Sequence, residues 1–352
     1  MFNKNFLVVC LCIFSLKLNA QIPNGYYNST NGLSGVALQQ ALHDIIDNHT
    51  VISYGNLYNA FGSTDQKTNG KVWDIYSDLP GGTPPYEYSN TSADQCGNYD
   101  SEADCYNREH SWPNSWFGGL SNIPTYSDLF HLYPTDGYVN NRRANNPYGE
   151  VTSATWTSEN GSKVGSNTTT GYSGTVFEPI DEYKGDLARG YFYLTTRYKG
   201  EDSNWDVSEM TNKATLLPWA VCLLLDWHHQ DSVSTKETNR NNSIYQLQNN
   251  RNPFIDHPEW ADSIFSCTLN PTGVEERRAM NKLSVYPNPA NDAVNVSGFN
   301  SGDNIQLCNF TGQVLSNFSH TRNSLSISVE NLPSGIYWLK GNKEGVKFIV
   351  SR

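Results

Sequence analysis

The pattern of apolar residues changes near residues 270–281, and this change divides the chain into two regions with different folds. Upstream, apolar residues recur at helical spacing between long loops rich in glycine, asparagine, serine and tyrosine. Downstream of about Leu283, short alternating runs are separated by turn residues, as in a small β-sandwich. The sequence therefore predicts an α+β chain: a mainly helical, loop-rich domain over 21–270, a linker over 271–282, and an all-β sandwich over 283–352.

The first twenty residues are typical of a secretory signal peptide. Lys4 precedes the apolar run Phe6–Leu16, and Leu18-Asn19-Ala20 provides a small-residue cleavage site. A membrane anchor is the alternative, but this run is too short to span a bilayer. We therefore expect cleavage after Ala20, secretion, and no stable membrane insertion.

Four helices are expected in the first domain. One begins after Ser34, a second covers 185–198, a third begins at Pro218, and a fourth begins with a capping box at Ser234. The fourth has almost no apolar face, so it is predicted to border solvent or line a polar groove. Residues 151–175 are predicted to form an extended arm or hairpin.

Five of the seven cysteines lie beyond the signal peptide. Cys96 and Cys105 bracket a short polar loop and can pair in an oxidising compartment. Cys222 lies in an apolar helix and is predicted to be a buried thiol. The sequence does not fix the state of Cys267 or Cys308.

The densest group of chemically useful side chains lies in residues 107–113. Glu109 offers a hard oxygen ligand, and Asn140, thirty residues after His110, offers a carbonyl oxygen. Two such ligands suit Mg²⁺, which completes its shell with water and phosphate oxygens. The His110 imidazole can take a proton from an attacking water, so the set fits metal-assisted phosphodiester hydrolysis. The alternative is that His110 is structural and packs beside Trp112.

The position of Glu109 next to His110 sets a geometric condition. Adjacent residues on a regular strand point to opposite faces. The two side chains can serve one reaction only at a strand end or an irregular turn, which Pro113 favours.

Four blocks between Gly25 and Phe265 resemble, in order, blocks of the bacterial endonuclease I family. They are NREHSWPNSWF, DLFHLYPTDGYVNNRRANNPYGEV, FEPIDEYKGDLARGYFYLTTRY and RNNSIYQLQNNRNPFIDHPEW. That family consists of secreted or periplasmic ββα-metal (His-Me finger) nucleases, so the resemblance implies a ββα-metal core embedded in the first domain.

The resemblance also implies roles for individual residues. His110 would be the general base, and Glu109 and Asn140 the ligands of Mg²⁺, with Mn²⁺ or Ca²⁺ as substitutes. The implied activity is cleavage of DNA, and often RNA, with little sequence preference and with 5′-phosphate ends.

The residues that would contact phosphate are less sharply indicated. Residues 111–139 contain no arginine. Arg143 could stabilise charge on the phosphate, or could pair with Asp128 or Asp136. Four polar residues of the last block are predicted to contact the nucleic-acid backbone, the alternative being a solvated helix face: Arg240, Gln248, Arg251 and Asn252.

Net charge limits how strongly nucleic acid can bind. The chain carries a formal charge of −11. Two leader lysines and a surplus of +2 over residues 279–352 leave the mature first domain at about −15. This balance predicts modest affinity, dependence on a divalent cation, and activity that falls as salt rises.

The last seventy residues resemble a second family. LSVYPNPANDAVNV and SGIYWLKGNKEGVKFIVS are similar to the sorting domain of the type IX secretion system. The resemblance implies export by the type IX machinery to the cell surface or medium. The rival interpretation of the whole chain is a non-catalytic surface adhesin or glycan-binding protein. We expect a monomer.

Overall fold

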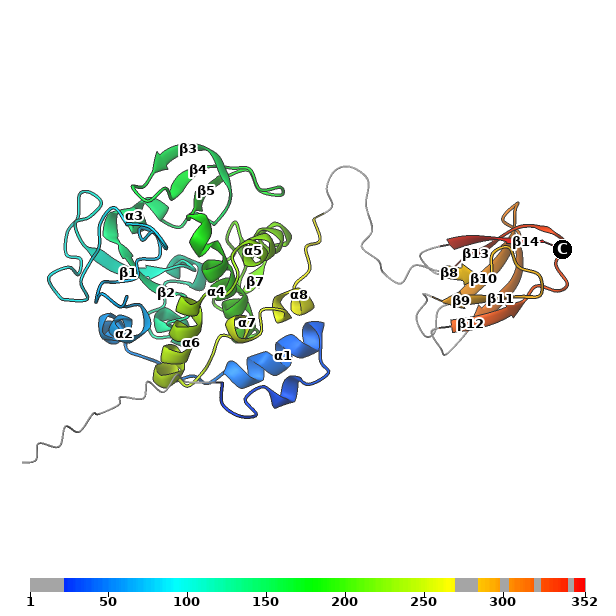
Figure 1. The fold of residues 1–352 in the computed structure, drawn as a ribbon, viewed down its shortest axis with the longest axis horizontal. Helices are drawn as coiled ribbons and strands as arrows, with labels where there is room; N and C mark the ends of the chain where they lie inside the picture. The colour runs from blue at the N-terminus through cyan, green and yellow to red at the C-terminus, as the bar shows by residue number, and fades with distance from the viewer. Residues whose placement is uncertain (1–21, 270–283, 298–303, 320–323, 341–344, 352) are drawn as a thin grey trace, which may run out of the picture. The chain divides into compact units, whose positions relative to one another are not determined.

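The computed structural model describes residues 22–269, 284–297, 304–319, 324–340 and 345–351, and the chain divides into two compact units. The first unit covers residues 1–269 and the second covers 270–352 (Figure 1). The predicted signal peptide and linker lie outside the described residues. None of the described helices combines the length and apolar character needed to cross a membrane.

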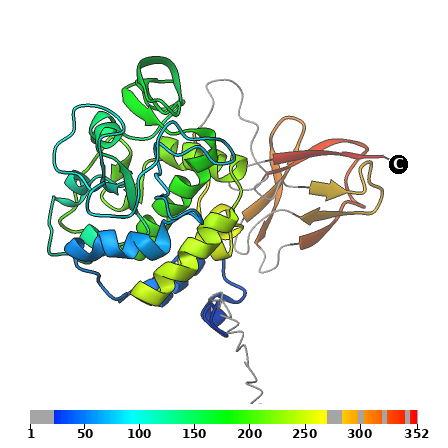
Figure 2. The ribbon, with the colours of Figure 1, turned by 60° about the vertical axis from the view of Figure 1, so that its left-hand side comes forward.

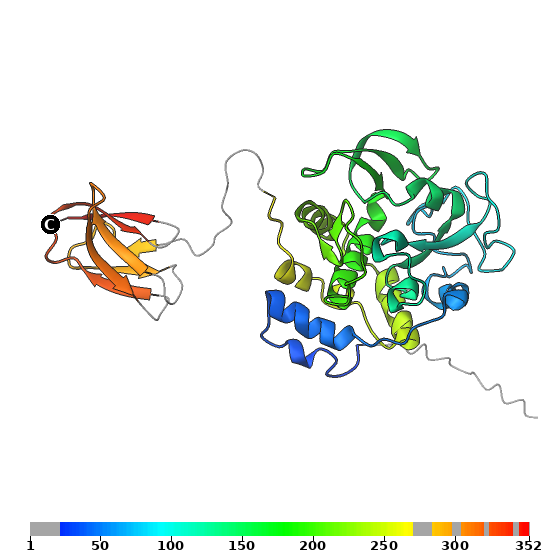
Figure 3. The same cartoon turned by 180° about the vertical axis from the view of Figure 1, so that it is seen from behind.

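The helices of the first unit surround a single buried core. Their bounds are α1 Gly35–Ile46, α2 Leu57–Thr64, α3 Gly137–Arg143, α4 Lys184–Arg197, α5 Pro218–Gln230, α6 Thr235–Gln248, α7 Pro253–Asp256 and α8 Trp260–Ile264. The four expected helices are confirmed as α1, α4, α5 and α6. The capping box of α6 is present, with Ser234 and Glu237 bonding each other's backbone N–H groups. Figure 2 shows α6 packed beside α2, and Figure 3 shows α1 beside α8.

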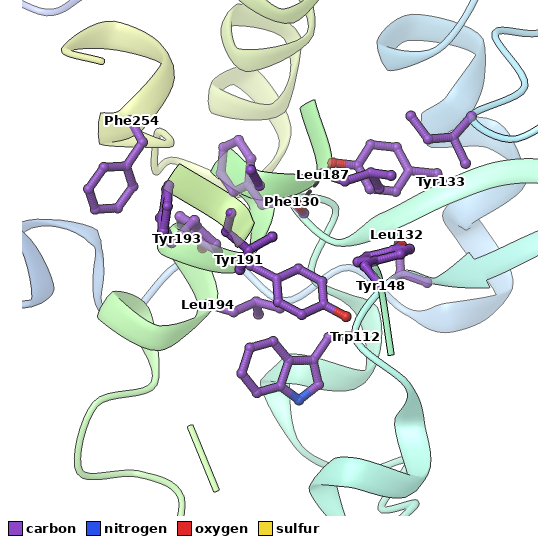
Figure 4. Packing of buried hydrophobic residues seen from close by; sticks show 14 of the residues in the cluster. Trp112, Phe130, Leu132, Tyr133, Tyr148, Leu187, Tyr191, Tyr193, Leu194 and Phe254 are labelled. Carbon is purple, nitrogen blue, oxygen red and sulfur yellow. Dashed lines mark hydrogen bonds between the residues drawn. The ribbon is translucent and has the colours of Figure 1, made fainter. Parts of the chain in front are cut away.

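Helix α4 is the centre of this core, and every residue of it is buried. It packs against α5. Tyr191 of α4 lies between Trp112 and Tyr148, with ring centroids 4.9 and 5.3 Å away (Figure 4). Its hydroxyl donates to the carbonyl oxygen of Ser111 at 2.7 Å. The core therefore supports directly the segment that follows His110.

Short antiparallel sheets complete the first unit. Strands β1 (Tyr106–His110) and β2 (Leu132–Asp136) pair with each other, and α3 follows β2 without a loop. Asp136 caps α3 by accepting a hydrogen bond from Val139 N. The extended segment predicted over 151–175 forms a three-stranded sheet of β3 Val151–Thr157, β4 Lys163–Asn167 and β5 Thr175–Glu178. A two-stranded ribbon is formed by β6 Thr211–Asn212 and β7 Thr215–Leu216.

The second unit is all-β among its described residues, as predicted. One sheet has the order β11-β10-β13-β14 and the other β12-β9-β8. Side chains of the two sheets, including Val294, Ile305, Leu339 and Phe348, form one apolar core. The bounds are β8 Ser284–Tyr286, β9 Ala293–Ser297, β10 Asn304–Asn309, β11 Val314–Ser319, β12 Ser324–Ser328, β13 Gly335–Lys340 and β14 Gly345–Val350.

Two disulfides lie in the first unit. Cys96 and Cys105 are bonded to each other, as predicted. The prediction of a free thiol at Cys222 is wrong, because Cys222 is bonded to Cys267. That partner lies beyond α8, where no local pattern relates it to α5. Cys308 is a buried free thiol.

Candidate active site

Glu109 and His110 are the last two residues of β1, the position that the adjacency argument requires. Glu109 lies opposite Tyr133 of β2, and His110 lies opposite Leu132. The two side chains contact different residues: Glu109 contacts Tyr76 and Arg143, and the His110 ring lies against Tyr54 and Tyr126. Within the described structure, no hydrogen bond or ion pair joins the His110 ring to Glu109 or Asn140.

The Glu109 carboxylate is buried and held at one oxygen. Its Oε1 accepts a hydrogen bond from the Tyr76 hydroxyl at 2.8 Å and lies 3.1 Å from Arg143 Nη1. Oε2 accepts no side-chain hydrogen bond from the described residues. Burial raises the pKa of Glu109 to about 7, although Arg143 and Tyr76 act to lower it. Tyr76 and Arg143 therefore hold one oxygen of the carboxylate, and no described side chain bonds the other.

The His110 ring is oriented by a backbone carbonyl. Its Nε2 lies 2.9 Å from the carbonyl oxygen of Tyr126. A carbonyl oxygen can only accept, so Nε2 carries the proton and Nδ1 keeps its lone pair. Burial, with a smaller effect of His131, lowers the pKa of His110 to about 3, so the ring is neutral near pH 7. His110 is 8% exposed.

Asn140 lies on α3, one turn before Arg143. Residues three apart are neighbours on a helix surface, and the Arg143 guanidinium reaches Glu109. Asn140 therefore lies on the side of α3 that faces the Glu109 side of β1. Its side chain is half-buried and makes no hydrogen bond to any described residue.

Arg143 does not match either sequence-based alternative. It is 1% exposed, so it is not available to a phosphate, and it pairs with Glu109 rather than with Asp128 or Asp136. Its Nη1 donates to the carbonyl oxygen of His110 at 3.1 Å, and its Nη2 donates to that of Ser111 at 2.5 Å. Arg143 thus ties the Glu109 carboxylate to the backbone where β1 ends, which makes it a positioning residue.

The four residues predicted to contact nucleic acid lie in the interior, so this prediction is wrong. Each is at most 4% exposed and is bonded within the protein. These residues can be buried because partners distant in sequence or on the adjoining turns satisfy their polar groups. Their polar character was therefore not a sign of exposure. The contacts are Arg240 with Asp65 and with the carbonyl oxygens of Leu129 and Leu132, Gln248 with Asp128 and Leu129 N, Arg251 with Asp256 and Asn242, and Asn252 with Arg189 O and Asn241.

Two residues that the sequence analysis missed support the site. Tyr76 bonds Glu109, and Asp74 accepts hydrogen bonds from Thr135 Oγ1 at 2.6 Å and from Asp136 N at 2.7 Å. Asp74 thereby fixes the junction between β2 and α3. No local signal marks either residue, because their partners lie 33 to 62 positions further along the chain.

A second group of acidic and imidazole side chains lies elsewhere. His43, Asp47 and Glu201 are the one set of three such residues, within the described ranges, whose ligand atoms lie within 4.8 Å of one another. Arg197 Nη1 already pairs with Asp47 at 2.9 Å and with Glu201 at 2.7 Å. This group is therefore a partly exposed ion-pair cluster that Arg197 already occupies.

Comparison with known families identifies both units. Residues 34–259 match the model of the family described as Endonuclease I, and residues 284–351 match that of the secretion system C-terminal sorting domain. The first match covers more than half of the chain, so the chain belongs to the Endonuclease I family and is a nuclease. The sorting domain marks it for secretion or the cell surface. The adhesin interpretation is not supported.

Individual relatives agree with this assignment. The chain is 37% identical over 246 residues to a protein of Bacillus amyloliquefaciens named extracellular ribonuclease, covering 68% of this chain and 78% of that one. A protein of the same name from Bacillus subtilis (strain 168) is 35% identical over 245 residues, with the same coverage. Endonuclease-1 of Buchnera aphidicola is 28% identical over 129 residues, covering 37% of this chain and 46% of that one.

Proposed function

We propose that this protein is a secreted, divalent-metal-dependent endonuclease. It hydrolyses phosphodiester bonds in DNA and RNA with little regard to sequence, and it leaves 5′-phosphate ends. The names of the relatives, extracellular ribonuclease and endonuclease-1, support this breadth of substrate. In this proposal β1, β2 and α3 are the ββα-metal core, and its residues act where β1 ends.

His110 is the general base. Its Nδ1 accepts a proton from the attacking water, while Nε2–H stays bonded to the Tyr126 carbonyl and keeps the ring in place. The imidazole is neutral before reaction because burial lowers its pKa. A phosphate beside the ring raises that pKa by charge attraction, which favours proton transfer at the moment of attack.

The remaining residues fit a divalent cation. Glu109 Oε2 and the Asn140 carbonyl oxygen are hard oxygen donors, the type that Mg²⁺ takes, and Mn²⁺ and Ca²⁺ accept the same donors. Burial penalises the charged form of Glu109, and Arg143 compensates only in part, so the carboxylate can accommodate further positive charge. When bound, the cation neutralises charge on the phosphate and stabilises the leaving oxygen. Arg143 and Tyr76 keep Glu109 in position.

The single observation that carries this proposal is the Nε2 contact of His110, because it leaves the Nδ1 lone pair as a proton acceptor at the end of the strand that also carries Glu109. The test incubates supercoiled plasmid and, separately, RNA with the mature protein and Mg²⁺, Mn²⁺, Ca²⁺ or a chelator. We expect cleavage only with a cation, and products that accept a 5′ label only after phosphatase treatment. His110→Ala should lower cleavage by about 10²- to 10⁴-fold, the usual contribution of a general base, at an unchanged melting temperature. Intact plasmid and RNA with every cation would refute the proposal.

Export by the type IX machinery is the second part of the proposal. It rests on the match of residues 284–351 to the sorting domain. A chain truncated before Leu283 should remain inside a host that carries this system. Its appearance in the medium at the full-length level would argue against the role.

A further inference from the structure

Arg108 lies on the same side of β1 as the proposed base. Side chains two positions apart on a strand share a face, and the Tyr54 ring lies against both Arg108 and His110. The side chain of Arg108 is half-buried.

Two tyrosines hold the Arg108 guanidinium. Its Cζ lies 4.0 Å from the ring centroid of Tyr54 and 4.6 Å from that of Tyr58. The Tyr54 ring is also nearly parallel to the His110 ring, with centroids 5.9 Å apart and planes at 13°. Through the shared Tyr54 ring, the guanidinium lies at most about 10 Å from the imidazole. Arg108 is therefore oriented in advance beside the reaction centre.

The charge of Arg108 is not neutralised by the protein. Five other arginines of the described chain pair with carboxylates: Arg143, Arg189, Arg197, Arg240 and Arg251. Arg108 pairs with none in the described part of the chain. Its Nη1 donates to the carbonyl oxygen of Tyr54 at 3.1 Å, and its buried Nε has no partner.

An oriented guanidinium with free N–H donors recognises a phosphate through paired hydrogen bonds. Most contacts to nucleic-acid phosphates fix the position of the strand and carry no sequence information. The adjacent Tyr54 and Tyr58 rings offer faces on which a sugar or base can lie. These properties match a single-stranded phosphodiester chain passing the end of β1.

We propose that Arg108, clamped between Tyr54 and Tyr58, binds a phosphate of the substrate strand beside His110 and thereby positions the scissile bond. This deepens the proposed function and rests on it. Residues 111–139 contain no arginine and Arg143 is buried, so Arg108 is the arginine next to His110 that a phosphate can reach. Within a first domain whose formal charge is about −15, Arg108 provides a local positive charge at the site.

The test measures binding and cleavage separately. In a His110→Ala background, a fluorescein-labelled single-stranded DNA oligonucleotide is titrated with the mature protein at several salt concentrations. Adding Arg108→Ala should raise Kd about tenfold, as expected for charge-assisted hydrogen bonds. The slope of log Kd against log salt should fall by about 0.7, the value for one phosphate contact on a single strand. With His110 intact, Arg108→Ala should raise KM and change kcat less.

Arg142→Ala is the matched control. Arg142 also has no carboxylate partner among the described residues, but it is exposed and bonds the Tyr138 hydroxyl on its own helix. It should change Kd less than twofold. Arg108→Lys keeps the charge and loses the planar fork, so it should raise Kd while leaving the salt slope unchanged, and it replaces Arg108→Ala if that variant does not fold.

Three outcomes separate the proposals. Unchanged Kd and salt slope in Arg108→Ala, or an equal effect of Arg142→Ala, would overturn the role of Arg108. Arg108-dependent binding by a wild-type protein that cleaves nothing would support the phosphate site and refute the nuclease mechanism. Cleavage by the wild type together with an unaffected KM in Arg108→Ala would support the nuclease and refute the phosphate site at Arg108.

Discussion

The disulfide Cys96–Cys105 offers a test of how the start of α3 is held. The loop that it closes contacts the first residue of α3: Gly137 N donates to the carbonyl oxygen of Cys105 at 2.9 Å. A Cβ on Gly137 would lie 2.5 Å from Cys96 Sγ, so the bridge is packed against this glycine. In addition, Ala103 N donates to Asp136, the residue that caps α3, at 2.9 Å. Opening the bridge should therefore loosen the helix that carries Asn140.

The stability effect can be estimated from the loop lengths. The cysteines are separated by 9 residues in this bridge and by 45 in Cys222–Cys267. Loop-closure entropy gives about 2.6 kcal/mol for the shorter loop and about 4.0 kcal/mol for the longer one at 25 °C. Replacing each pair by serines should lower the free energy of unfolding by about these amounts.

For the Mg²⁺ requirement of cleavage we expect the reverse order: loss of the shorter bridge should have the larger effect. The Cys96→Ser, Cys105→Ser variant should need several-fold more Mg²⁺ for half-maximal cleavage. The Cys222→Ser, Cys267→Ser variant, although less stable, should keep the wild-type requirement. Urea unfolding and Mg²⁺ titration of cleavage measure the two quantities. An unchanged Mg²⁺ requirement in the first variant would refute the positioning role of the loop, and a greater stability loss in the first than in the second would refute the entropy estimate.

Three further changes probe the interior. Tyr76→Phe removes the hydrogen bond to Glu109. The free energy of unfolding, measured with urea, should therefore fall by about 2 kcal/mol, and half-maximal cleavage should need more Mg²⁺. Wild-type values for both quantities would contradict the contact. Arg240→Met leaves Asp65 buried without its partner and should lower the free energy of unfolding by about 3–5 kcal/mol; a stable variant with weakened oligonucleotide binding would instead restore the nucleic-acid role of Arg240. Burial lowers the pKa of His228 to about 4 from its usual 6.5. Between these values the unfolded state binds a proton that the folded state does not, so the contribution of His228 to stability is complete above pH 6.5 and is lost as the pH falls toward 4. The melting temperature should therefore fall more over this window in the wild type than in His228→Gln, and equal falls would count against the assignment.

Helix positions were predictable because their signals are local. The Ser234 capping box and the proline at the first turn of α5 mark where helices begin, and both are observed. The placement of Glu109 and His110 at a strand end was predicted from the condition that both side chains serve one reaction, since a regular strand would direct them apart. The partner of Cys222 did not follow, because 45 residues separate it from Cys267.

The polar helix α6 shows why the rest of the site was not predictable. Its near-absence of an apolar face predicted that it borders solvent or lines a polar groove, yet Arg240 and Gln248 are buried. Arg240 can be buried because Asp65, 175 residues earlier, neutralises it, and because it bonds the carbonyl oxygens of Leu129, before β2, and of Leu132, the first residue of β2. A buried charge is tolerated when it is paired and fully bonded. Whether a polar residue lies inside thus depends on a partner that only the fold supplies.

This pairing changes what the net charge of the first domain can tell. A total of about −15 counts every arginine equally, but paired guanidinium groups contribute little field at the surface because each has a carboxylate partner within about 4 Å. The field near His110 depends instead on the unpaired Arg108 and, in the proposed mechanism, on the cation at Glu109 and Asn140. A polyanion can therefore approach this one point of an acidic protein, with an affinity that depends on few contacts. Such binding should weaken only moderately as salt rises, because the salt dependence scales with the number of phosphates contacted.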